Sequence, residues 1–259
     1  MTLSQDKLVE IRAIIKDCLR KKLANYKPET SSMPFHYRLL GKDRMALFSF
    51  VQSLNTTFGT SIFEPVAKVI AKINYPIVEK QFIVGDKIRE NAQSEIQHII
   101  DHLSSGVSSP DKIKETELIR QACKAGAINS LKLVKVDLFL QDNIGVKYLF
   151  DLKTAKPNAS NFKDFKRTLL EWVAILLTTN QSEKVKSLIA IPYNPYEPEP
   201  YERWTLRGML DLKEELLVGN EFWDFLGGTG TYEMLLSCFE AVGLEMRPEF
   251  DNYFARFSK

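Results

Sequence analysis

Three Asp-x-Lys tripeptides have a residue spacing that suits acid–base or metal chemistry. They are Asp151-Leu152-Lys153, Asp164-Phe165-Lys166 and Asp211-Leu212-Lys213. The second and third lie in segments predicted to be helical, where residues two apart point in different directions. The first follows a strand-like apolar run, and residues two apart on a strand share a face. We therefore expect only Asp151 and Lys153 to aim a carboxylate and an ammonium group the same way.

A predicted β-hairpin adds a second carboxylate to this pair. Residues 131–140 and 146–153 alternate in hydrophobicity on either side of a turn. A three-residue loop would place Asp137 opposite Asp151, and a five-residue loop would place it diagonal to Asp151, with Cβ separations of roughly 5–8 Å. Both registers keep Asp137, Asp151 and Lys153 on one face, whereas a four-residue loop would separate them.

Two carboxylates held this close repel each other unless a cation lies between them. All-oxygen ligands suit Mg²⁺, with Mn²⁺ as a substitute, rather than Zn²⁺. We expect Asp137, Asp151 and the backbone carbonyl of Leu152 to hold the ion, which would polarise a phosphate and lower the pKa of a bound water. Lys153 would orient or deprotonate that water. A surface hairpin with cross-strand charges is the alternative that these residues alone leave open.

The elements around the hairpin predict an α/β fold, a mixed sheet flanked by helices, with helical regions at both ends of the chain. Helices are predicted over 4–24, 42–54, 61–72, 88–103, 110–124 and 162–179. Residues 55–60 read as a turn, followed by a capping box of Ser61 and Glu64. The apolar run 187–192 is expected to form a strand parallel to 146–153, because a helix joins the two. From Leu210 onward the chain reads as helical, with breaks at Gly227-Gly228 and Gly243.

The composition is that of a globular chain, with 44% hydrophobic and 26% charged residues among 259. There is no membrane-length apolar run and no signal-like N-terminus, and three scattered cysteines indicate reduced thiols, so we expect a cytoplasmic protein. Residues 132–167 carry eight basic and four acidic side chains, and residues 197–251 carry thirteen acidic and four basic ones. This distribution favours a polyanion on one face. Two solvated surfaces of opposite sign explain it equally well.

The spacing of Asp137 and the tripeptide Asp151-Leu152-Lys153 resembles the PD-(D/E)xK nuclease signature, with Val136 at the position of the proline. Longer stretches resemble the TdeIII-type family of type II restriction endonucleases. These are VKVDLFLQDNIGVKYLFDLKTAKPN, YNPYEPEPYERWTLRGMLDLKEELLVGNEFWDFLGG and YEMLLSCFEAVGLEMRPEFDNYF. The resemblance covers the C-terminal half well and the N-terminal half more loosely, through residues 55–64.

The resemblance implies a restriction-endonuclease-like core in a single endonuclease domain, 1–259. The catalytic core would lie at about 42–195, and 196–259 would be a helical recognition or dimerisation region. It further implies Mg²⁺-dependent, site-specific cleavage of unmethylated double-stranded DNA by a homodimer, with a DNA methyltransferase as functional partner. A repair or recombination nuclease of the same superfamily and a non-catalytic DNA-binding relative are the alternatives, and the intact motif argues against the second.

Further candidate residues follow from their positions. Restriction endonucleases of this superfamily often place a glutamate from an N-terminal helix near the metal, which makes Glu64 a fourth candidate for the site beside its capping role. Lys156 and Lys163 follow the motif and are candidates for phosphate contacts at the start of the helix predicted over 162–179. As solvated lysines they are equally well explained.

The stretch 193–207 is rich in proline and aromatic residues and contains Arg203 and Arg207. Arginine reads guanine through two hydrogen bonds in the major groove. We expect these two arginines to contact DNA, and a packed irregular loop is the alternative.

Overall fold

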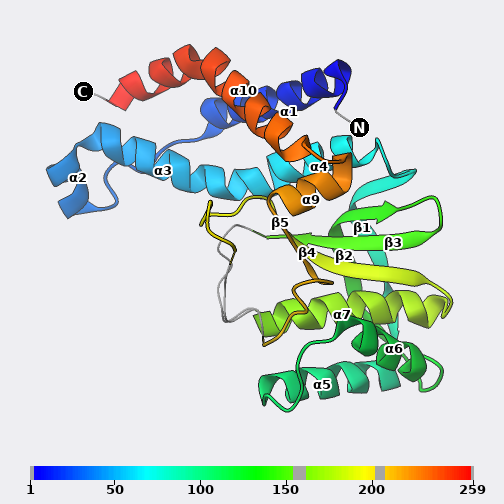
Figure 1. Cartoon of the computed structure of the whole chain (residues 1–259). Helices are drawn as coiled ribbons and strands as arrows, with labels where there is room; N and C mark the ends of the chain where they lie inside the picture. Colours follow the sequence, from blue (N-terminus) through cyan, green and yellow to red (C-terminus); the bar gives the residue numbers. More distant parts are fainter. Residues whose placement is uncertain (1–2, 154–161, 202–207, 258–259) are drawn as a thin grey trace. The chain divides into compact units, whose positions relative to one another are not determined.

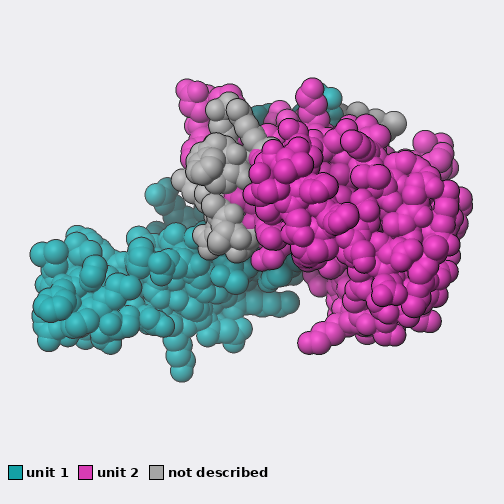
Figure 2. Space-filling model, turned by 90° about the horizontal axis from the view of Figure 1, so that it is seen from below, with its two compact units in different colours: residues 1–70, 227–259 teal, residues 71–226 magenta. Residues whose placement is uncertain are grey.

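The computed structural model describes residues 3–153, 162–201 and 208–257 of the chain. The chain forms two compact units, unit 1 of residues 1–70 and 227–259 and unit 2 of residues 71–226, which are coloured separately in Figure 2. Unit 1 is helical, and unit 2 contains the β-sheet (Figure 1). No helix in the described ranges is long and apolar enough to cross a membrane.

Unit 1 is built from helices at the two ends of the chain. They are α1 (Gln5–Asn25), α2 (Pro34–Leu40), α3 (Lys42–Thr57), a π-helix (Phe58–Phe63), α4 (Glu64–Ala71), α10 (Thr231–Phe254) and a 3-10 turn (Ala255–Phe257). Helices α1 and α10 pack against each other, and the ion pair Lys16–Glu245 joins them at 2.6 Å. Phe50 of α3 packs edge-on against Phe254 of α10. The N-terminal and C-terminal segments therefore share one core.

Unit 2 contains a five-stranded mixed sheet. Its strands are β1 (Ile77–Arg89), β2 (Ile128–Gln141), β3 (Val146–Leu152), β4 (Lys184–Ile191) and β5 (Leu216–Val218). They follow one another across the sheet in the order β1-β2-β3-β4-β5. The pairs β1–β2 and β2–β3 are antiparallel, and the pairs β3–β4 and β4–β5 are parallel.

Helices cover both faces of this sheet within unit 2. They are α5 (Glu90–Ser104), α6 (Lys112–Ala122), α7 (Phe162–Thr179) and α9 (Asn220–Gly227). Helix α7 packs directly on the sheet, and α5 and α6 pack against α7 in turn (Figure 1). Ten residues of α7 are buried, as expected for a helix enclosed between two layers. On the other face, the ring of Phe150 in β3 contacts Phe222 of α9.

Most predicted elements are confirmed. Helices α1, α3, α5, α6 and α7 begin and end within three residues of their predicted positions. The predicted hairpin is β2 with β3, and the predicted apolar strand is β4, which lies parallel to β3 with α7 as the connection. The mixed α/β fold with helical regions at both ends is therefore confirmed.

The predicted turn at residues 55–60 is wrong. Helix α3 continues through it into the π-helix, which leads directly into α4. The predicted capping box is wrong as well, because Ser61 lies inside this helical run and the Glu64 N–H already donates to the carbonyl of Gly59. Tertiary packing overrides the local turn signal, since Phe58 and Phe63 stack at 5.5 Å and Ile62 is fully buried.

Three further differences concern strands and a glycine. Strand β1 was not predicted, and β5 interrupts a stretch expected to be helical. The break at Gly227-Gly228 is confirmed, but α10 continues through Gly243. A glycine inside a helix costs about 1 kcal/mol, which the burial of neighbours such as Val242 and Met246 outweighs.

Candidate active site

The turn between β2 and β3 sets the register of the hairpin. The Asp142 N–H donates to the Val146 carbonyl at 3.1 Å, so the loop has three residues, 143–145. The Asp142 carboxylate accepts the N–H of Val146 at 2.8 Å, which fixes the turn. The pairs continue to Leu138 opposite Phe150, and one further step places Asp137 opposite Asp151. The first of the two predicted registers is confirmed.

Asp137 is held at both carboxylate oxygens. Its Oδ2 accepts the backbone N–H of Leu152 at 2.8 Å. Its Oδ1 accepts the side-chain amide of Gln81, from β1, at 3.3 Å. The hydrogen bonds come from the two strands that flank β2, so the orientation of this carboxylate depends on three strands.

Asp151 is buried beside the Lys153 ammonium, whose Nζ lies 2.8 Å from Asp151 Oδ1. Only 8% of Asp151 is exposed. The pKa of Asp151 is raised from an ordinary 3.8 to about 6, first by burial and then by the Asp137 carboxylate, while Lys153 opposes both without cancelling them. The surroundings of Asp151 therefore disfavour its ionised form, and perturbed pKa values of this kind cluster at functional sites.

Lys153 directly follows β3 and is fixed on two sides. Its backbone N–H donates to the Ala190 carbonyl of β4 at 2.9 Å. Its Nζ lies 4.7 Å from the centre of the Phe165 ring in α7, close enough for a cation–π contact. Asp137, Asp151 and Lys153 are thus brought together at the end of the hairpin, on the side that carries α7.

The side-chain donors at this site are carboxylate oxygens, which hard divalent cations prefer. No group of three or more His, Cys, Asp and Glu residues that could hold a metal ion occurs in the part of the chain that the structure describes. Mg²⁺ keeps several waters and is commonly held by one or two carboxylates together with a substrate phosphate. Two adjacent carboxylates, one with a raised pKa, fit that pattern.

The other predicted site residues have different outcomes. Lys163 is exposed near the start of α7, where a phosphate could reach it. Lys156, Arg203 and Arg207 lie outside the described residues. Glu64 is 3% exposed and belongs to unit 1, whereas the hairpin belongs to unit 2, so its place in the site stays a prediction.

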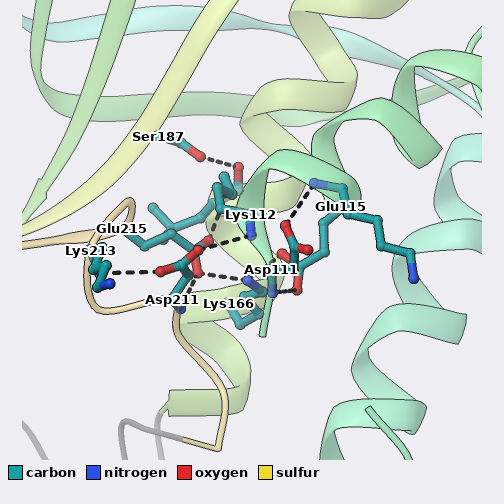
Figure 3. A network of polar contacts seen from close by, with 10 residues as sticks. Asp111, Lys112, Glu115, Lys166, Ser187, Asp211, Lys213 and Glu215 are labelled. Atoms are coloured by element: carbon teal, nitrogen blue, oxygen red, sulfur yellow. Dashed lines mark hydrogen bonds and ion pairs between the residues drawn. The ribbon is translucent and has the colours of Figure 1, made fainter. Parts of the chain in front are cut away.

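Lys166, one of the eight basic residues counted in 132–167, does not lie on the surface. It is fully buried, and it forms ion pairs with Glu115 and, at 2.6 Å, with Glu215 (Figure 3). Lys112 pairs with the same Glu215 at 2.8 Å. Burial raises the pKa of Glu215, but Lys112 and Lys166 outweigh it, so the net pKa of Glu215 is lowered. This buried network ties α6, α7 and the segment before β5 together, and Lys166 is next in sequence to Phe165, whose ring contacts Lys153.

Gln81 is the residue of this site that the sequence analysis missed. The apolar pairs Ile77-Val78 and Ile83-Val84 were the available signal for strand β1, because β-branched residues are enriched in strands. Polar residues separate the two pairs and break the alternation. Nothing in the local sequence indicates that Gln81 faces Asp137, since that depends on the pairing of β1 with β2.

Known proteins similar to this chain were found by comparison of sequences. A family model described as type II restriction endonuclease, HinfI, matches residues 4–243. The restriction enzyme MjaII of Methanocaldococcus jannaschii is 27% identical over 81% of this chain, and the alignment spans 58% of that enzyme. The restriction enzymes HgiEI and HgiBI of Herpetosiphon aurantiacus are each 26% identical over 83% of this chain and 79% of their own length. The expected class of protein is confirmed, and the matching model carries the name HinfI rather than TdeIII.

Proposed function

This chain belongs to the HinfI family of type II restriction endonucleases, and from that premise we propose that it cleaves double-stranded DNA at a short specific site by Mg²⁺-dependent phosphodiester hydrolysis. The observation that carries the proposal is the closeness of three groups: Asp137 Oδ2 accepts the Leu152 N–H at 2.8 Å, next to Asp151, and Lys153 Nζ lies 2.8 Å from Asp151 Oδ1. Opposed carboxylates beside an ammonium group suit the hydrolysis of a phosphodiester, because both a cation and a proton acceptor are needed there.

Each residue has a separate task in this proposal. Asp137, Asp151 and the Leu152 carbonyl would hold Mg²⁺, which when bound supplies a Lewis acid for the phosphate and lowers the pKa of a water. Lys153 would add positive charge beside the scissile phosphate and orient the attacking water as an ammonium group, or would accept the proton of that water as a neutral amine. Asp151 must lose its proton to act as a ligand, and its pKa of about 6 permits this at neutral pH.

DNA contacts and partners belong to the same proposal. Lys163, exposed on α7, and Lys156 would contact phosphates. Arg203 and Arg207 would read bases, and Glu64 would add a carboxylate to the site. We propose a homodimer, because two copies of one site can cut both strands, and a cognate DNA methyltransferase that protects the host sequence.

The test is cleavage of unmethylated plasmid DNA with Mg²⁺ or with EDTA. Three proteins are compared: the unmodified chain, Asp151→Ala, and the control Asp164→Ala, which alters the exposed aspartate of a look-alike tripeptide on α7. The proposal expects discrete fragments with Mg²⁺ from the unmodified chain and the control, and none from Asp151→Ala. Smears or nicks would point to a nuclease without site specificity, and normal cutting by Asp151→Ala would show that the site is assigned wrongly.

A further inference from the structure

Gln81 has an unusual backbone conformation. Its φ is 52°, which makes it the one non-glycine residue with a positive φ in the described part of the chain. This left-handed region is disfavoured for residues with a Cβ, and glutamine lacks the short side chain that lets asparagine and aspartate adopt it. Strained residues of this kind persist only when the surrounding structure holds them, and they cluster at functional sites.

The strand around Gln81 holds it in this conformation. On one side Lys80 pairs with Leu138, and on the other Phe82 pairs with Val136, in the same register. Gln81 is therefore level with Asp137, and the irregularity in β1 begins only later, near Gly85. Regular pairing on both sides leaves the strain confined to the one residue that faces the candidate site.

The strained conformation places the Gln81 amide on Asp137. The amide Nε2 lies 3.3 Å from Asp137 Oδ1, while the Leu152 N–H occupies Oδ2 at 2.8 Å. A neutral donor is suited to this position, because it orients the carboxylate without neutralising its charge. A lysine there would compete with the cation that the carboxylate attracts.

We propose that Gln81 is a positioning residue that fixes the Asp137 carboxylate for metal binding, and that its backbone strain is retained for this purpose. The inference rests on the proposed function, because it assumes that Asp137 is a metal ligand. Residues that hydrogen-bond to metal ligands commonly change metal affinity or activity by about 10–100-fold when they are replaced.

Two substitutions separate the amide from the strain. Gln81→Met removes the amide and keeps the left-handed strain, and Gln81→Gly removes both. Glu79→Gly is the matched control, because Glu79 is an exposed residue of the same strand with ordinary backbone. Mn²⁺ binding is measured by electron paramagnetic resonance without DNA, and the melting temperature is measured with EDTA.

We expect both Gln81 variants to bind Mn²⁺ about 10–100-fold more weakly. Gln81→Gly should melt higher than the unmodified chain, by about 2–4 °C, because the strain is gone, whereas Glu79→Gly should melt lower and bind Mn²⁺ normally. If Gln81→Met binds Mn²⁺ as the unmodified chain does, or if Gln81→Gly melts lower, the inference is overturned. If the unmodified chain binds no Mn²⁺, or Asp151→Ala binds it equally well, the proposed metal site fails and the inference fails with it.

Discussion

Replacing Asp151 by asparagine should stabilise the metal-free protein at pH 8. Asparagine keeps the shape of the side chain and removes a charge that is only 8% exposed. The pKa of Asp151 is about 6 in the folded chain, against an ordinary value of 3.8. At 1.36 kcal/mol per pH unit, that difference means that ionised Asp151 costs about 3 kcal/mol.

The raised pKa of Asp151 determines how the stability of the folded chain changes with pH. The folded chain binds this proton more tightly than the unfolded chain does, so stability falls as the pH rises from about 4 to about 6 and stays low above that. Asparagine cannot ionise. The variant should therefore match the unmodified chain near pH 4 and exceed it by about 3 kcal/mol at pH 8.

The difference in free energy of unfolding is measured by urea titration in EDTA at pH values from 4 to 8, with circular dichroism as the signal. Asp164→Asn, which makes the same substitution on the exposed face of α7, is the control. Mg²⁺ at a hundredfold excess over its dissociation constant should add about 2.7 kcal/mol to the unmodified chain and little to Asp151→Asn. A variant that is less stable at pH 8, or a difference that does not change with pH, would refute the reasoning.

Three further predictions concern the support of the site and its DNA contacts. Lys166→Met should lose about 3–5 kcal/mol of stability in urea unfolding, because it leaves two buried glutamates without this partner; a loss below about 1 kcal/mol would contradict the buried network. Gly85→Ala should lose about 1–3 kcal/mol in the same assay, since φ is 151° and a Cβ would lie 2.8 Å from Ile175 Cγ2; unchanged stability would contradict that packing. Lys163 is exposed on the same helix as Lys166. The Lys163→Met protein should be as stable as the unmodified chain and bind DNA more weakly, and the salt dependence of its DNA binding should fall by about one ion. An unchanged salt dependence would exclude a phosphate contact.

Local patterns explain why much of the fold could be predicted. Both ends of helix α7 were predicted to the residue, because a long apolar stretch lies between polar residues. The hairpin was predicted because its turn residues and alternating strands are adjacent in the sequence. The same proximity made it possible to place Asp137, Asp151 and Lys153 together.

Long-range pairing explains what could not be predicted. Strand β1 pairs with β2, two helices later in the chain, and its polar centre around Gln81 conceals the strand pattern. Lys166 looks like a surface lysine in the sequence, because its partners Glu115 and Glu215 lie about 50 residues away on either side. The pairing of β1 with β2 and the ion pairs of Lys166 both join segments that are far apart in the sequence, so they form only in the folded chain.

The three-residue turn at 143–145 limits how the gene for this protein can change in length. Strand faces alternate with a period of two, so one inserted residue would turn Asp137 to the opposite face, and a second insertion would return it. Single insertions should therefore be lost by selection wherever the site is needed, while double insertions persist. Among diverging copies of this gene, we expect the length of the turn to differ by even numbers of codons.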